Sequence, residues 1–230
     1  MKTIILNNKC YLSYKEMMDY KNTLESINNK DLNIVLLPNI AYLSLFKESK
    51  LNIGTQNFYS YNYGAYTGEV CLESLKDLNV TYTLVGHPER LELRLDTYTE
   101  IKDKLYRSLN SDFKTILCIG KDESEKMIKK ELKYYLSNIE YKSFKNLIIA
   151  YEPYSKIEED DVDLVDIELK KECITKYIKK HFDEEVTFIY GGAVNKDNIN
   201  DILSITDGVL IGRNSIDVKE LKSLIDNKAS

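Results

Sequence analysis

The chain has 230 residues, of which 30% are charged and 43% are hydrophobic, and its formal net charge is −5. This length suits one large α/β domain or two small ones, and a mildly acidic chain has no electrostatic reason to bind nucleic acid. No apolar run approaches the length of a membrane span, and the first residues are too quickly polar for a signal peptide. We therefore expect neither nucleic acid nor a membrane among the partners of this chain.

The cysteine and histidine content adds two expectations. The four cysteines form no C-x-x-C pair, which predicts reduced thiols and a cytoplasmic location; they are Cys10, Cys71, Cys118 and Cys173. Because the chain has only two histidines, we expect no zinc cluster. We also expect no other metal site and no cofactor.

Short apolar runs alternate with amphipathic segments along the whole chain. The expected strands are Thr3–Leu6, Asn33–Leu37, Leu51–Gln56, Thr81–Val85, Phe113–Ile119, Leu147–Glu152, Val186–Tyr190 and Gly208–Ile211. The expected helices are Tyr14–Ile27, Ile40–Glu48, Leu72–Leu78, Leu95–Leu109, Glu123–Tyr141, Ile167–Phe182, Asp197–Leu203 and Val218–Ile225. A loop rich in tyrosine and glycine, Tyr59–Gly68, follows the third strand.

This alternation predicts a parallel sheet, and eight strand–helix units in a chain of this length match a (β/α)8 barrel. A doubly wound open sheet is the rival architecture. Such a sheet usually carries a glycine-rich turn after its first strand, whereas here that turn is Asn7-Asn8-Lys9-Cys10. We therefore predict a single (β/α)8 barrel domain that covers residues 1–230.

Three side chains that can do chemistry follow the ends of predicted strands. In a barrel the C-terminal strand ends share one face, which places Lys9, His87 and Glu152 around one mouth. One carboxylate base with two electrophilic donors suits proton abstraction next to a carbonyl group. The plainer interpretation of Glu152 is a rim carboxylate that pairs with a lysine.

The neighbouring residues indicate the protonation state of His87 and a place where an anion could bind. Proline after His87 suits the first turn of a helix, and the positive end of a helix dipole disfavours an imidazolium, so a neutral imidazole donor is expected. Gly191-Gly192 and Gly212 each stand at a strand end and leave backbone N–H groups bare, an arrangement that suits a phosphate group.

Motifs in the same order along the whole length resemble those of the triosephosphate isomerase family, whose fold is the TIM barrel. They are Asn7 and Lys9 in N-x-K, Gly54–Asn57 in G-x-Q-N, Gly64–Val70 in GA[FY]TGE, Val85–Arg90 at GHSER, Leu117–Gly120 at LCIG, Ala150–Pro153 in AYEP, Tyr190–Val194 at YGGSV and Asp207–Gly212 in DG-x-L-[VI]-G. The resemblance implies the interconversion of dihydroxyacetone phosphate and glyceraldehyde 3-phosphate, in glycolysis and gluconeogenesis, without a cofactor.

The resemblance also implies residue roles, which are those established for the family. Glu152 would be the base that moves a proton between adjacent carbons, and His87 would polarise the carbonyl and pass protons between the oxygens. Lys9 and Asn7 would stabilise the enediolate and hold the substrate, and Glu89 would support Lys9.

A homodimer is expected on two grounds. In the family's dimer the loop that corresponds to Tyr59–Val70 reaches into the neighbouring subunit, which implies interface roles for Tyr66 and Thr67 and places Cys10 near the interface. In addition, several aromatic side chains crowd this loop, as is typical of an interface; they are Tyr59, Tyr61, Tyr63 and Tyr66.

The chain departs from the family pattern where the family binds phosphate. The family's lid after AYEP is V-W-A-I-G-T-G, whereas this chain reads Tyr154–Asp161, and the lid glycine falls at Glu158. The serine after YGG is Ala193, and the second glycine after the last strand is Arg213. Position by position, the resemblance implies phosphate contacts at Glu158, Gly192, Ala193, Gly212 and Arg213, besides Asn7 and Lys9.

These departures change the expected interaction energy with a phosphate group in opposite directions. Backbone N–H contacts need no side chain, and Arg213 could add a charge-assisted contact of ~1.5–3 kcal/mol, or could instead pair with an acid such as Glu158 or Asp160. An acid at roughly 5 Å from a phosphate costs about 3 kcal/mol per unit-charge pair at an effective dielectric constant near 20. Either the lid acids face solvent, or the lid closes differently, or the ligand differs.

Three functions therefore remain open from the sequence. The first is a divergent triosephosphate isomerase, and the second is an isomerase of a related phosphorylated ketose such as a tetrulose phosphate. The third is a sugar-phosphate-binding paralogue of low activity, which the intact Asn7, Lys9, His87 and Glu152 argue against.

Overall fold

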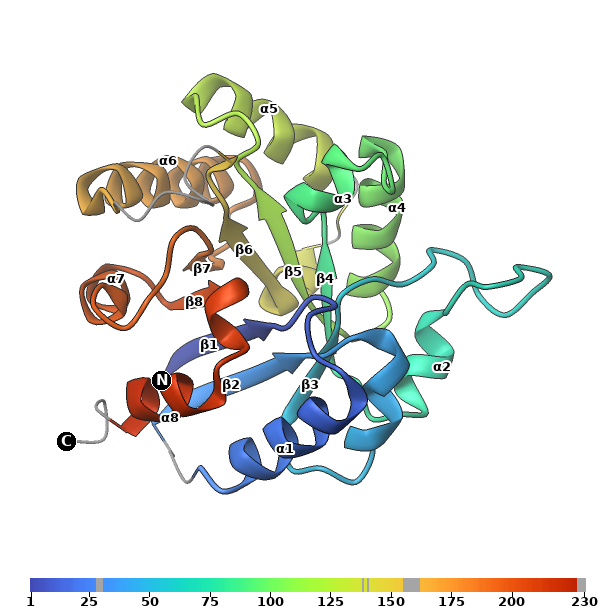
Figure 1. Cartoon of the computed structure of the whole chain (residues 1–230). Helices are drawn as coiled ribbons and strands as arrows, with labels where there is room; N and C mark the ends of the chain where they lie inside the picture. The colour runs from blue at the N-terminus through green and yellow to red at the C-terminus, as the bar shows by residue number, and fades with distance from the viewer. Residues whose placement is uncertain (28–30, 138, 140, 155–161, 227–230) are drawn as a thin grey trace.

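The computed structural model describes residues 1–27, 31–137, 139, 141–154 and 162–226 and shows a closed barrel of parallel strands (Figure 1). The strands are β1 Lys2–Asn7, β2 Leu32–Leu37, β3 Asn52–Thr55, β4 Tyr82–Val85, β5 Lys114–Ile119, β6 Leu147–Tyr151, β7 Thr187–Tyr190 and β8 Gly208–Ile211. Each strand pairs with the next, and β1 closes the barrel against β8, with Thr3 opposite Gly208 and Leu6 opposite Ile211. The predicted barrel is confirmed, and the open doubly wound sheet is wrong.

Helices surround the strands (Figure 1). The α-helices are α1 Tyr14–Glu25, α2 Leu72–Lys76, α3 Pro88–Glu92, α4 Tyr98–Leu109, α5 Glu125–Leu136, α6 Leu164–Phe182, α7 Ile199–Ile205 and α8 Val218–Asp226, and the short 3-10 helices are η1 Ile40–Phe46, η2 Tyr141–Asn146 and η4 Arg213–Ser215. None of the helices in the described part of the chain is long and apolar enough to cross a membrane.

The strands are apolar on both faces because the barrel has two separate cores. Alternate side chains of a strand point to opposite faces, so Ile5 belongs to the core inside the barrel while Ile4 and Leu6 pack under the helices. The inner core also contains Val35, Leu37, Tyr82, Leu84, Ile116, Cys118, Ile148, Ala150, Ile189 and Leu210. A strand buried on both faces reads as a continuous apolar run, as the sequence does here.

Several predicted element boundaries were wrong. The strand expected to reach Glu152 ends at Tyr151, and the helix expected over Glu123–Tyr141 ends at Leu136. The segment Ile40–Phe46 is a 3-10 helix. The helix expected from Leu95 begins at Tyr98, because Thr97 and Glu100 form a capping box that fixes the helix start.

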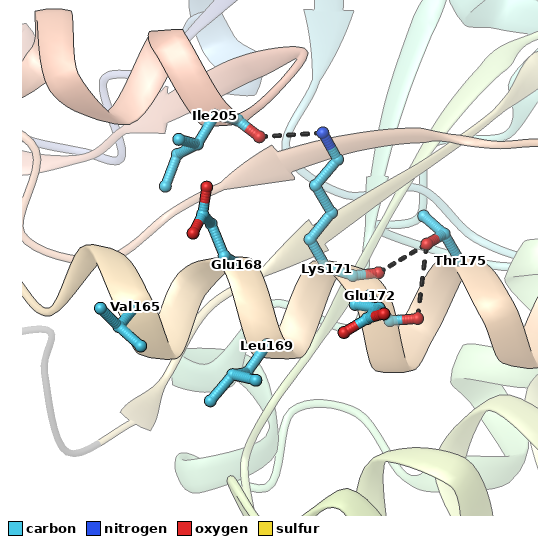
Figure 2. A pocket seen from close by; sticks show the side chains of 7 residues that line it. All are labelled: Val165, Glu168, Leu169, Lys171, Glu172, Thr175 and Ile205. Atoms are coloured by element: carbon cyan, nitrogen blue, oxygen red, sulfur yellow. Dashed lines mark hydrogen bonds between the residues drawn. The ribbon is translucent and has the colours of Figure 1, made fainter.

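The outer wall of the barrel contains a cavity beside α6 (Figure 2). Lys171 Nζ donates to the backbone oxygen of Ile205 at 2.9 Å, which satisfies a carbonyl at the C-terminal end of α7. Thr175 Oγ1 donates to the Lys171 carbonyl at 2.8 Å (Figure 2). The Lys171 hydrogen bond joins α6 to α7. None of the predicted site residues lines this cavity.

Candidate active site

The predicted chemical residues meet at the C-terminal ends of the strands. Asn7 ends β1, His87 follows β4 and Glu152 follows β6. A cavity of about 570 Å³ opens there, a size that suits a small metabolite. Its lining includes eight of the predicted residues, namely Lys9, His87, Glu89, Glu152, Gly192, Ala193, Gly212 and Arg213.

Glu152 is buried, with 2% of its surface exposed. Its Oε2 lies 3.5 Å from His87 Nε2, and its Oε1 has no hydrogen-bond partner among the described residues. A Cβ on Gly191 would lie 2.5 Å from Glu152 Cγ, so only glycine permits this approach. Burial and the Glu152 carboxylate raise the pKa of the neighbouring Cys118 thiol. The carboxylate therefore faces an imidazole and a neutral thiol.

His87 is held at the start of a helix. It caps α3, and its Nδ1 accepts a hydrogen bond from the backbone N–H of Glu89 at 3.3 Å, while Pro88 occupies the first helical position. Because an accepting Nδ1 carries no proton, a neutral ring has its proton on Nε2, the nitrogen nearest to Glu152. In that tautomer Nε2 is the nitrogen that can donate into the cavity.

Lys9 stands in an uncommon backbone conformation, with φ at +51°. Its ammonium pairs with the Glu89 carboxylate. Its backbone N–H donates to Asn7 Oδ1 at 3.2 Å, and Gln56 Nε2 donates to the carbonyls of Lys9 and Leu37, each at 2.9 Å. Sequence reasoning placed Gln56 in a motif but missed this bracing contact.

The glycine loops after β7 and β8 also line the cavity. Burial raises the pKa of the Tyr190 hydroxyl, and the backbone N–H of Ala193 acts against that rise. A Cβ on Gly192 would lie 2.1 Å from that hydroxyl oxygen, which explains the glycine. Arg213 is exposed at the cavity edge and begins η4. Glu158 and the lid acids that could pair with Arg213 lie outside the described residues.

The loop predicted to form a dimer contact is separate from this cavity. It extends away from the barrel between β3 and α2 (Figure 1), and residues 61–69, which include Tyr66 and Thr67, are all exposed. The N–H of Tyr59 donates to the carbonyl of Val70 at 2.8 Å and so closes the base of the loop. Cys10 is exposed next to Lys9, and all four cysteines are free.

Comparison with known proteins decides the family. The model of the triosephosphate isomerase family matches residues 2–228. The chain belongs to the triosephosphate isomerase family. It is 35% identical over 246 residues to the triosephosphate isomerase of Orientia tsutsugamushi (strain Ikeda), an alignment that covers 98% of this chain and 97% of that protein.

Two further relatives show a similar degree of divergence. The triosephosphate isomerase of Mesomycoplasma hyopneumoniae (strain 7448) is 32% identical, with 99% of this chain and 100% of that protein covered. The triosephosphate isomerase of Ureaplasma parvum serovar 3 is 33% identical, with 98% and 99% covered. The chain is thus a divergent triosephosphate isomerase family member that is aligned along nearly its whole length.

Proposed function

We propose that this chain is a triosephosphate isomerase, which interconverts dihydroxyacetone phosphate and glyceraldehyde 3-phosphate by moving one proton through an enediolate. The observation that carries the proposal is the convergence of the buried Glu152 carboxylate and His87 Nε2 at 3.5 Å, in a cavity that Lys9 also lines. A base and two electrophilic groups around one small cavity suit proton transfer between the adjacent carbons of an aldose and a ketose.

Glu152 is the proposed base. Its Oε1, which has no partner among the described residues, is available to accept a proton from the substrate carbon. Burial keeps water away from the carboxylate, so the proton can be returned to the neighbouring carbon rather than lost to solvent.

His87 and Lys9 are the proposed electrophiles. The contact between Nδ1 of His87 and the Glu89 amide orients the ring, so that Nε2–H can donate to the substrate oxygen. The Lys9 ammonium stabilises the negative charge of the enediolate, and Asn7 and Glu89 hold this lysine in place.

The proposed phosphate site is the wall formed by Gly192, Ala193, Gly212 and Arg213. Its support is that these residues line the same cavity as the proposed base. Bare backbone N–H groups at strand ends suit an anion, and a guanidinium adds a charge-assisted contact. Glu158 remains a proposed contact of the closing lid by position alone.

We also propose a cytoplasmic homodimer. The exposed loop of residues 61–69 carries three tyrosines, Tyr61, Tyr63 and Tyr66, whose exposed fractions are at least 41%. Exposed aromatic side chains on a protruding loop are typical of an interface. Thr67 at this loop is the residue proposed to reach the neighbouring subunit, with Cys10 near the interface.

A coupled assay with glyceraldehyde 3-phosphate, run beside tetrulose phosphates, tests the function. We expect kcat/KM to be highest for the triose phosphate. A higher kcat/KM for a tetrulose phosphate would instead support the isomerase of a related ketose. Tight binding without turnover of any of these substrates would support the low-activity paralogue.

A further inference from the structure

Asn214 joins the two glycine loops of the cavity. It lies in η4, the turn that follows β8, and its Nδ2 donates to the backbone oxygen of Val194 at 2.8 Å. Val194 belongs to the loop after β7, where its own N–H donates to the Gly192 carbonyl at 2.8 Å. One side chain thus connects the loop that presents Gly192 to the turn that begins at Gly212.

The turn around Asn214 is anchored from its other side. Asn8 Nδ2 donates to Ser215 Oγ at 3.1 Å, and the Tyr20 hydroxyl donates to the Ser215 backbone oxygen at 2.6 Å. These three residues are buried, so η4 is fixed to the β1 loop and to α1. Buried hydrogen bonds of this kind hold a turn firmly, because breaking them leaves polar groups buried without a hydrogen-bond partner.

The loop after β7 is braced separately. Asn198 Nδ2 donates to the Ala193 carbonyl at 2.7 Å, and Asn198 stands just before α7. Each of the two glycine loops is therefore attached to its own part of the fold. Beyond the paired strands β7 and β8, the hydrogen bond from Asn214 to Val194 joins the two loops directly.

We propose that Asn214 is a positioning residue that fixes the width of the phosphate-binding wall and thereby raises the affinity for the phosphate group. The inference rests on the proposed phosphate role of these loops. A phosphate bound by backbone groups from two loops gains affinity when their spacing is set before binding, because less conformational entropy is lost. Glu152 and His87 follow β6 and β4 and lie outside the two glycine loops, so the chemical step depends little on this contact.

The test is Asn214→Ala, with the affinities for inorganic phosphate and 2-phosphoglycolate measured by calorimetry. We expect both dissociation constants and the KM for glyceraldehyde 3-phosphate to rise about three- to tenfold, which is the scale of one net hydrogen bond. We expect kcat to stay within about twofold, since the base and the electrophiles keep their places.

Asn52→Ala is the matched control. Asn52 begins β3 at the opposite end of the barrel, where its Nδ2 donates to Asn33 Oδ1 at 2.8 Å. This variant also loses one hydrogen bond of an exposed asparagine, and its phosphate affinity is expected to match that of the wild type. Thermal unfolding is measured for both variants to check that each is folded.

Two results would overturn the positioning role. One is a folded Asn214→Ala variant with unchanged phosphate affinity, and the other is an equal loss of affinity in Asn52→Ala. A wild-type protein that binds phosphate but does not isomerise the triose phosphate would contradict the proposed function instead. The phosphate measurements on Asn214→Ala remain decisive in that case, because binding does not require turnover.

Discussion

Lys9 combines a charged side chain with a left-handed backbone conformation. Such a conformation costs of order 1–3 kcal/mol for a residue other than glycine and persists only where neighbours enforce it. Asn7 and Gln56 supply that enforcement through hydrogen bonds to the N–H and the carbonyl of Lys9. This backbone conformation places the Lys9 side chain in the cavity lining, with its ammonium beside the Glu89 carboxylate.

Replacement of the proposed base gives the first prediction. Glu152→Gln keeps the shape of the side chain but cannot accept the proton, so kcat is expected to fall by at least ~10²–10⁴-fold. Circular dichroism and phosphate affinity are expected to match the wild type. A variant that keeps a tenth of the wild-type kcat would show that Glu152 is not the base.

Arg213 gives the second prediction. If its guanidinium binds phosphate, Arg213→Gly raises the dissociation constants of inorganic phosphate and 2-phosphoglycolate by about tenfold or more. Each tenfold change corresponds to ~1.4 kcal/mol of binding free energy. Lys196→Ala, which removes another exposed charge next to the β7 loop, serves as the control for long-range electrostatics. Unchanged affinity with an altered salt dependence of turnover would instead favour a pairing of Arg213 with the lid acids.

At the scale of elements, a buried ionic cluster joins α3, α4 and the segment before the tyrosine loop. Only 2% of the Asp96 side chain and 7% of the Lys104 side chain are exposed, and the two groups form an ion pair. Arg90 Nε reaches the other Asp96 oxygen at 2.6 Å, and Lys104 Nζ also donates to Asn57 Oδ1 at 2.8 Å. The cluster supports the helix that His87 caps, because Arg90 lies in α3.

Removal of Asp96 is the third prediction. Asp96→Ala leaves the Lys104 ammonium buried without its carboxylate, and the free energy of unfolding is expected to fall by about 3–5 kcal/mol. Glu125→Ala, which breaks the exposed pair with Lys129, is expected to change it far less, because exposed ion pairs are solvated and contribute little. Urea unfolding measures both variants, and equal losses would contradict the special cost of the buried pair.

The order of the elements was predictable because it depends on local patterns. Each strand is a short apolar run, and the functional side chains at Lys9, His87 and Glu152 directly follow such runs. The start of α4 could have been read from Thr97 and Glu100, which the sequence analysis overlooked. The contacts of Gln56 with Lys9, of Asn214 with Val194 and of Lys104 with Asn57 could not be predicted in this way, since these partners lie 47, 20 and 47 positions away and two of the acceptors are backbone carbonyls.

At the scale of the whole molecule, the protruding tyrosine loop predicts self-association. The rings of Tyr59, Tyr61 and Tyr66 lie within 5.6 Å of one another by their centroids, so the loop presents a compact aromatic surface. Such a surface gains free energy when a second copy removes it from water.

Sedimentation at micromolar concentration is the measurement for this fourth prediction. We expect a mass near twice the 26.7 kDa of one chain. Tyr66→Asp is expected to shift the mass towards the monomer, whereas Tyr106→Asp on α4 is not, although the two tyrosines are similarly exposed at 41% and 47%. A wild-type mass of 26.7 kDa would refute the dimer.

The closure of β1 on β8 also has a consequence for the growing chain on the ribosome. Thr3 and Gly208 pair across almost the whole sequence, so β1 can meet its final neighbour only after residue 211 has been made. At ~5–20 residues per second, the ribosome needs about 10–40 seconds for that stretch. Throughout this time the backbone N–H and C=O groups on that edge of β1 have no strand partner in the chain, so they are open to pairing with a strand of another nascent chain until β8 has been made.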